Sequence, residues 1–193
     1  MEKQGLGIKN LYVHQGVSHV INIIDHIWHG TMTGKLMENC LQQLRLELGI
    51  NGPIFSKNQF LHDHYLLTDS WVANSWEFTS KHGIKFDELC PDINYVRAND
   101  GCIMEEVYKC TLVSDLEARK FNICRMYLQV FLVSDITSGD RKYIRKIAWE
   151  GSKDENRMSS ILWPKWGRPR PSYWANWRKV LKKYFCTKEY IGG

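Results

Sequence analysis

We predict a mainly α-helical protein, a compact multi-helix domain with irregular loops, from three features of the sequence. Apolar residues recur every three or four positions in several segments, which is the spacing of one helix face. Gly30, Gly49 and Gly83 stand just after three of these segments, where helices commonly end. Hydrophobic residues make up 44% of the 193 positions, so the chain can bury a core without disulfides or metals.

The first two helices are expected at residues 10–28 and 34–48. In the first segment the apolar residues keep helical spacing, although Gly16 weakens the expectation slightly. In the second segment, Thr33 has the side chain of an N-cap, and the apolar residues that follow share one side. Each of the two helices is therefore expected to have one apolar face.

A third helix is expected at residues 68–81, with its large apolar side chains directed inward. These inward side chains are Trp71, Val72 and Trp76. The irregular pattern of residues 84–101 predicts a loop with short extended pieces, and residues 103–108 predict a short helix. Further along the chain, a turn leads into a helical segment at 143–149.

The strongest helical segment is expected at residues 115–133, where Ser114 and Glu117 form a capping box. This segment is apolar on nearly every side, so we expect neighbours to surround it. Its one polar stripe is interpreted either as the solvent-facing side or as the lining of a groove for phosphate or a partner. The stripe consists of Asn122, Arg125 and Gln129. A buried strand over residues 126–133 is the alternative, because short apolar runs do not separate the two structures.

Positive charge is concentrated in residues 163–185, which read WPKWGRPRPSYWANWRKVLKKYF. The segment holds seven Lys or Arg, no Asp or Glu, and four of the eight tryptophans. The formal net charge of the chain is +5, so the remainder is slightly acidic, at 5 − 7 = −2. Because local charge produces binding potential, this segment is the candidate interaction surface.

We divide the chain here into a helical core domain, 1–162, and a segment of Trp, Pro and basic residues, 163–193, packed on that core. Prolines favour an extended course up to Ser172, which is a suitable N-cap for an amphipathic helix with a basic outer side. Trp174 and Trp177 fall on the apolar side of that C-terminal helix, so we expect them in the core.

The two tryptophans before this helix, Trp163 and Trp166, have two interpretations. Both stand beside lysine and arginine in an extended, proline-stiffened stretch. As exposed rings they would stack on nucleobases, which contributes roughly 1–3 kcal/mol per base. Alternatively, they clamp the segment onto the domain, with arginines packed on them as intramolecular cation–π pairs.

No motif of a polymerase, nuclease or nucleotide-binding protein is present, so we predict a non-catalytic protein with no cofactor. Three pairs of side chains have donor atoms for a metal but no defined third ligand. They are His26 with His29, His62 with His64 (Asp63 between them), and Asp135 with Asp140. The two aspartates also fit an ordinary turn. A metal-dependent hydrolase is kept as the second alternative.

The six cysteines follow no zinc or disulfide spacing, which indicates reduced thiols, several of them buried. The N-terminus has no basic stretch followed by an apolar run, and no window approaches about 18 continuous apolar residues. We therefore expect an intracellular protein, nuclear or cytoplasmic, without a membrane partner.

Four segments resemble the region downstream of the reverse-transcriptase domain in eukaryotic retroelement-type (non-LTR-like) proteins. They read GLGIKNLYVHQG (5–16), SWVANSWEF (70–78), FNICRMYLQVFLVSDITSGD (121–140) and WPKWGRPRPSYWANWRKVL (163–181). The resemblance implies a post-polymerase piece that holds template or primer. The Tyr-x-Asp-Asp motif of polymerases is absent, so such a piece does not polymerise alone.

We predict non-catalytic binding of the RNA or DNA backbone by a C-terminal piece of a reverse-transcriptase-related mobile-element protein. The cationic side chains contact phosphates, and the first two tryptophans add stacking. The predicted residues are Trp163, Lys165, Trp166, Arg168, Arg170, Arg178, Lys179, Lys182 and Lys183. The first alternative is a protein-interaction module that docks on a polymerase domain or on a second copy of itself. Its expected sign is a large exposed apolar patch on the first two helices.

Overall fold

The computed structural model describes residues 10–58, 70–88, 95–98, 100–152, 163 and 165–185. In these ranges the chain forms eight helices and no strand, which confirms the mainly α-helical class. The helices are α1 (Leu11–Trp28), α2 (Met32–Leu48), α3 (Trp71–Lys81), α4 (Ile103–Tyr108), α5 (Asp115–Leu128), α6 (Val133–Ile136), α7 (Lys146–Glu150) and α8 (Pro171–Tyr184). None of the helices in these ranges has both the length and the apolar character needed to cross a membrane.

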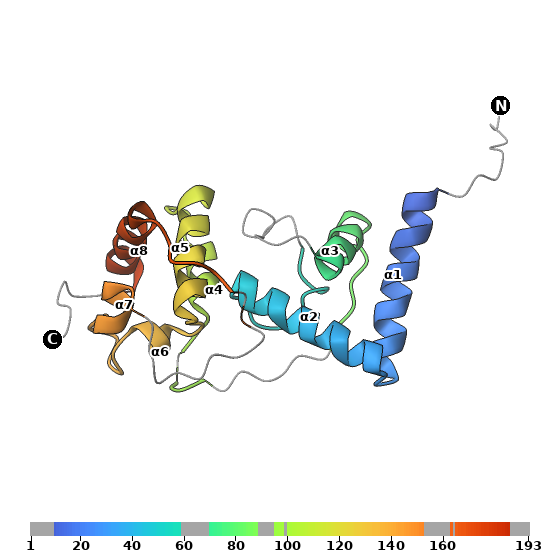
Figure 1. The fold of residues 1–193 in the computed structure, drawn as a ribbon, viewed down its shortest axis with the longest axis horizontal. Helices are drawn as coiled ribbons and strands as arrows, with labels where there is room; N and C mark the ends of the chain where they lie inside the picture. The colour runs from blue at the N-terminus through green and yellow to red at the C-terminus, as the bar shows by residue number, and fades with distance from the viewer. Residues whose placement is uncertain are drawn as a thin grey trace, which may run out of the picture.

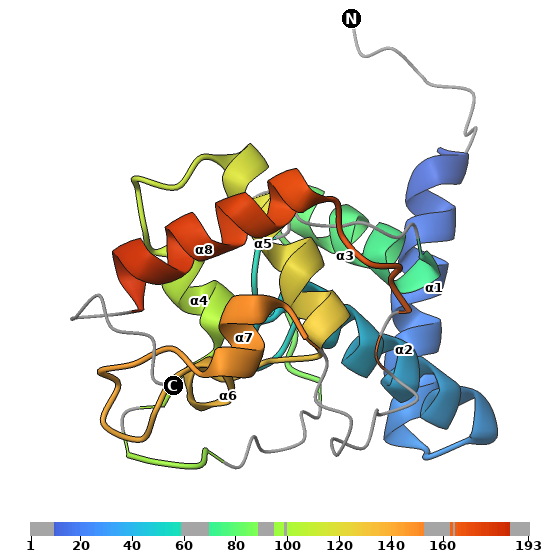
Figure 2. The ribbon, with the colours of Figure 1, turned by 60° about the vertical axis from the view of Figure 1, so that its left-hand side comes forward.

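The helices follow one another along the long axis of the molecule (Figure 1). The α1–α2 hairpin and α3 form one end, α7 and α8 lie at the other, and α4 and α5 stand between them. Helix α2 runs from the hairpin to α5, and it therefore joins the two ends. The view in Figure 2 shows α8 lying across α5, its main packing partner.

The α1–α2 hairpin requires a glycine where the two helices cross. Gly34 is buried, and a Cβ added to it would lie 2.1 Å from the carbonyl oxygen of His26 on α1. Thr31 rather than Thr33 is the N-cap of α2, because its hydroxyl accepts a hydrogen bond from Gly34 N (3.0 Å). The two threonines have the same capping chemistry, so the start predicted from the sequence, residue 34, is two residues later than the observed start at Met32.

Helix α3 packs on α1 through a second close approach. A Cβ on Gly16 would lie 2.2 Å from the ring of Phe78, so the glycine that weakens an isolated helix permits close packing here. Val72 and Trp76 are buried as predicted. Trp71 is 36% exposed, and the prediction that it points inward is wrong. The predicted start of this helix at residue 68 lies outside the described residues.

Helix α5 ends five residues earlier than predicted. Gln129 takes a left-handed conformation (φ 57°) that terminates the helix at a position where glycine is the usual residue. The chain then makes an isolated antiparallel bridge between Leu132 and Cys102 before it enters α6. The strand alternative for residues 126–133 is also wrong, since residues 126–128 are helical.

The shorter helices were predicted with mixed success. Helix α4 has the predicted bounds, and α5 starts where predicted, behind a capping box in which Ser114 and Glu117 exchange hydrogen bonds. The helix expected at 143–149 starts three residues later and corresponds to α7. The described parts of 84–101 contain neither helix nor strand, as predicted for a loop.

Two of the three residues of the predicted polar stripe of α5 are buried and the third, Gln129, is half-buried at the helix end, so the interpretation as a solvent-facing side or groove lining is wrong. Asn122 and Arg125 are both 0% exposed. Arg125 donates from Nε to Asn122 Oδ1 (2.7 Å) and from Nη2 to the carbonyl of Glu47 (2.9 Å). Its Nη1 donates to the carbonyl of Val130 (3.2 Å), just past the end of α5. The stripe thus satisfies carbonyls at helix ends, which have no partner within their own helices.

Helix α8 attaches to α5 through aromatic packing. The Trp177 ring stacks on Phe121 with centroids 4.3 Å apart, and its Nε1 donates to the carbonyl of Ala148 (2.8 Å). Trp174 and Trp177 are 7% and 0% exposed, which confirms that both belong to the core. The division of the chain at residues 162 and 163 stays a prediction.

Replacing Gly34 by alanine should lower the free energy of unfolding by about 2 kcal/mol, because the added methyl group forces α1 and α2 apart. Gly139→Ala is the matched control, since a Cβ there meets nothing within 4 Å, and it should stay within about 0.5 kcal/mol of the parent. Urea unfolding followed by tryptophan fluorescence measures both. Equal stabilities of the two variants would show that the crossing is not as close as described.

Candidate nucleic-acid interface

The candidate interface is the cationic segment, residues 165–183, which consists of an extended stretch followed by α8. Residues 165–170 form no helix or strand, as the prolines predict. Lys165, Arg168 and Arg170 are exposed, while Pro169 between them is buried and fixes the stretch to the domain. Basic side chains therefore project to solvent from a stretch whose backbone is held in place.

Helix α8 begins two residues earlier than expected from an N-cap at Ser172. Pro171 occupies its first turn and Arg170 is the N-cap, so Ser172 lies inside the helix. Proline is favourable there because the first N–H groups of a helix have no intrahelical partner. The buried residues Trp174, Trp177, Val180 and Leu181 define the inner face, and the basic residues lie on the outer face.

Trp149, at the end of α7, holds two of the basic side chains of α8. The Arg178 guanidinium lies 5.8 Å from the centroid of the Trp149 ring, and its Nε donates to the Trp149 carbonyl (3.1 Å). The Lys182 ammonium lies 5.4 Å from the same ring. An aromatic ring attracts a cation without neutralising it, so both side chains are oriented and keep their full charge.

Lys179 is the exception on this face, because a carboxylate neutralises it. Its Nζ lies 2.6 Å from Oε1 of Glu117 on α5. The Lys179 ammonium, with the backbone and hydroxyl of Ser114, lowers the pKa of the Glu117 carboxyl to about 2. The same pair raises the pKa of Lys179. Among the described residues, no carboxylate pairs with the six other cations of the segment.

Trp163, which precedes the extended stretch, and Trp166 within it are not equivalent. Trp163 is half-buried, and its ring centroid lies 5.6 Å from Cζ of the buried Arg125, which matches the intramolecular cation–π alternative. Trp166 is half-buried, and its buried Nε1 has no hydrogen-bond partner among the described residues. The packing of Trp163 on Arg125 ties the start of the segment to the centre of the domain.

The side chains proposed for a metal are occupied by structural hydrogen bonds where they are described. Asp135 Oδ2 accepts from the backbone N–H of residues 131 and 132, and Asp140 Oδ1 accepts from Ser138 Oγ (2.6 Å). His26 Nδ1 lies 3.0 Å from Thr31 Oγ1, and His29 bonds within its own helix turn. Within the described ranges, no three His, Cys, Asp or Glu side chains group as a metal site. His62, Asp63 and His64 lie outside those ranges.

The described cysteines are free, and two of them lie deep in the core. Burial raises the pKa of Cys102 and of Cys124 to about 12. These two thiols are therefore protonated at neutral pH and are not activated as nucleophiles. This agrees with the expectation that several cysteines are buried.

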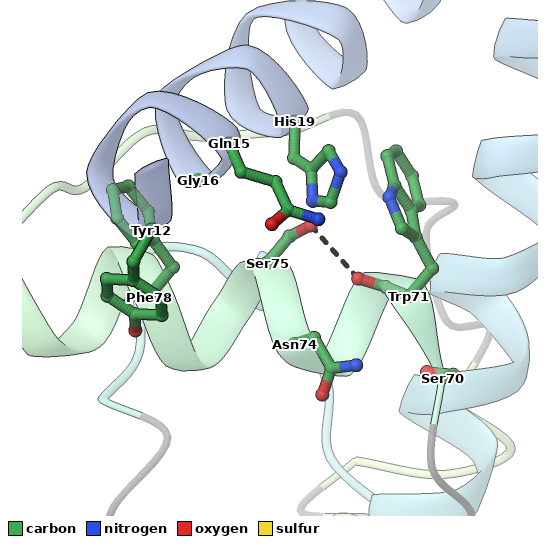
Figure 3. Close-up of a pocket in the computed structure, with 9 residues that line it drawn as sticks. All are labelled: Tyr12, Gln15, Gly16, His19, Ser70, Trp71, Asn74, Ser75 and Phe78. Atoms are coloured by element: carbon green, nitrogen blue, oxygen red, sulfur yellow. Dashed lines mark hydrogen bonds between the residues drawn. The ribbon is translucent and has the colours of Figure 1, made fainter. Parts of the chain in front are cut away.

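A cavity of about 410 Å³ opens between α1 and α3, at the other end of the molecule (Figure 3). Gln15, His19 and Asn74 present polar groups to it beside the rings of Tyr12 and Trp71. The Ser75 hydroxyl donates to the Trp71 carbonyl (3.0 Å) and so closes its floor with an internal bond. Figure 1 places α1 and α3 at the end of the molecule opposite α8, so this cavity lies far from the helical part of the cationic segment.

Compared with protein-family models, with curated proteins and with solved structures, the chain matches none. The resemblance to the region that follows a reverse-transcriptase domain therefore stays a prediction.

Sequence reasoning missed Trp149 and Glu117 as parts of this site. Both act on the cationic segment from other elements, and neither stands in a nucleic-acid-binding motif. The one available signal was the capping box, which places Glu117 at the exposed start of α5. That it also reaches Lys179 depends on how α5 and α8 pack, which no local pattern encodes.

The Glu117–Lys179 pair can be tested by titration. The carboxyl of Glu117 should titrate near pH 2 by carbon-detected NMR, and Lys179→Ala should shift that midpoint upward towards 4.5. The folded-state pKa is lowered, so the stabilisation from the pair is present above pH 4.5 and is lost as pH falls towards 2. Lys142→Ala is the control and should leave the Glu117 midpoint in place. An unchanged Glu117 midpoint in Lys179→Ala would show that the ion pair with Lys179 does not lower the pKa of Glu117.

Proposed function

We propose that this protein is a non-catalytic nucleic-acid-binding domain that holds the phosphate backbone of RNA or DNA through the cationic segment. The observation that carries the proposal is the set of exposed or ring-supported cations that no described carboxylate neutralises. They are Lys165, Arg168, Arg170, Arg178, Lys182 and Lys183. Such charges release counterions from a nucleic acid when they meet its phosphates, which favours binding.

Two features support backbone contacts in preference to base contacts. Trp163 is engaged with Arg125, so its ring contributes anchoring rather than a stacking platform. The described cations come from a helix and an extended stretch, and three of the six are lysines, which bind phosphates as point charges. The proposed binding is therefore largely independent of sequence.

We extend the proposal to the origin of the chain on the strength of the sequence resemblance. A piece that follows a reverse transcriptase would hold template or primer for that enzyme, and a sequence-independent backbone contact suits this task. In this proposal the chain does no chemistry of its own.

The second candidate function is protein interaction, and one observation favours it. Large apolar side chains on α1 and at the start of α2 are exposed, among them Trp28 at 84% and Met32 at 74%. Monomeric proteins seldom expose such a patch without a use for it. The two functions are compatible because the patch and α8 lie at opposite ends of the molecule (Figure 1).

The double variant Arg168→Ala with Arg170→Ala should bind a single-stranded RNA or DNA of about 20 nucleotides roughly tenfold more weakly at low salt. The plot of the logarithm of the association constant against the logarithm of the salt concentration should also become shallower by about 1.5, since each lost phosphate contact removes about 0.7–0.9 from its slope. Fluorescence anisotropy at several salt concentrations measures both quantities.

Lys35→Ala with Lys85→Ala is the matched control, because it removes the same charge from exposed positions outside the cationic segment. This control should lower the affinity only slightly and leave most of the salt slope. If both double variants behave alike, binding depends on net charge alone and the proposed interface is wrong.

Glu117→Gln should strengthen binding two- to threefold, because it releases Lys179 for a phosphate.

A further inference from the structure

Helix α1 has an apolar stripe that no described neighbour covers. Val13, Val17, Ile21, Ile24 and Trp28 are 37–84% exposed. At 3.6 residues per turn these five positions fall within an arc of about 80°. The buried residues of α1, Gly16, Val20 and Ile23, lie on the adjacent arc, towards α2 and α3. The stripe is therefore a second apolar face of the helix, beside the one that packs on the core.

The extent of this face suits a stable protein interface. Its five side chains expose on the order of 600 Å² of surface, a large part of the roughly 800 Å² that each partner buries in an interface of standard size. Met32 and Leu36 at the start of α2 are also exposed, at 74% and 60%. Isolated exposed apolar residues need no explanation, but five on one arc of one helix do.

The charge of α1 favours a second copy of the same helix as the occupant. Its 18 residues include no Lys, Arg or Glu, and Asp25 is its one acidic residue. Asp25 borders the stripe, about 40° around the helix from Ile21, and its carboxylate lies 3.1 Å from His29 Nδ1. The five side chains of the stripe itself carry no charge, so two such faces meet without like-charge repulsion between them, whereas a strongly charged partner would find no complementary charge.

The spacing of the stripe also fits helix-on-helix packing. Val17, Ile21, Ile24 and Trp28 are separated by four, three and four residues, which is the alternation along the seam of two packed helices. In an antiparallel pair centred between Ile21 and Ile24, each of these two residues faces the other across the seam. Trp28 then lies against Val17 of the second copy. A two-fold axis makes both halves of this contact identical, as homodimers require.

We propose that the α1 stripe is a homodimer interface in which two copies of α1 pack antiparallel about a two-fold axis. A mainly apolar cavity of about 470 Å³ borders the stripe between Ile24, Trp28 and Phe86, and it receives side chains from the first half of the second copy's α1. Helix α8 lies at the end of the molecule opposite α1 (Figure 1), so the proposed dimer leaves both copies of α8 away from the interface. The proposal does not depend on nucleic-acid binding.

Sedimentation equilibrium between about 1 and 100 µM tests the interface, because dimers of moderate affinity dissociate in that range. The parent protein should show a mass near twice 22.7 kDa that falls on dilution. Ile21→Glu and Ile24→Lys should each be monomeric at the same concentrations. Leu112→Glu is the matched control, since Leu112 is 68% exposed away from α1, and it should remain a dimer.

Mixing the two charged variants tests the antiparallel geometry. In the mixed dimer, the carboxylate introduced by Ile21→Glu faces the ammonium introduced by Ile24→Lys, and the mass should return towards that of the dimer. A parent protein that stays monomeric at every concentration overturns the proposal, and so does an Ile21→Glu variant that remains a dimer. If both variants are monomeric and their mixture is too, the antiparallel pairing is wrong. Arg168→Ala with Arg170→Ala should stay dimeric, which separates this test from that of nucleic-acid binding.

Discussion

The guanidinium of Arg125 lies between the carbonyl end of α2 and the carbonyl end of α5, and both ends depend on it. It donates to the carbonyls of Leu46, Glu47 and Val130. Gly49 makes this approach possible, because its left-handed backbone (φ 69°) ends α2 and a Cβ there would lie 3.0 Å from Arg125 Cζ. Burial lowers the pKa of Arg125 to about 10, still well above 7, so the side chain is charged at the negative end of the α2 dipole. A buried charge is costly by itself, and here hydrogen bonds and the helix dipole offset that cost.

This contact connects the fold to the proposed function. Helix α2 belongs to the hairpin end and α5 carries α8, so Arg125 sets how the two ends of the molecule are joined (Figure 1). Trp163 packs on the outer side of the same guanidinium and thereby fixes where the extended stretch begins. The position of the exposed cations of the cationic segment thus depends on the buried guanidinium of Arg125. At the opposite end, the same architecture leaves one face of α1 without a described partner.

The sequence predicted features that short-range chemistry determines and missed those that depend on distant partners. The capping box at Ser114 and the bounds of α4 were predictable because each involves neighbouring residues. The burial of Arg125 was not, because its partners in α2 are more than 70 positions away. One signal was available: the polar stripe of α5 contains no Lys or Glu, the residues that usually cover a solvated helix face. The cationic segment was predictable from composition, whereas the ion pair that neutralises Lys179 was not.

The role of Arg125 is tested most directly by the urea unfolding of Arg125→Met, compared with Arg119→Met on the exposed side of the same helix. The methionine keeps most of the side-chain volume but removes the Arg125 donors to the carbonyls of Leu46, Glu47 and Val130, and of these three Glu47 keeps a hydrogen bond from Asn122 Nδ2 (2.8 Å). We expect Arg125→Met to lower the free energy of unfolding by about 3–5 kcal/mol and Arg119→Met to change it by less than about 0.5 kcal/mol. A loss below about 1 kcal/mol in Arg125→Met would contradict the account, because the two ends of the molecule would then be joined without the buried guanidinium.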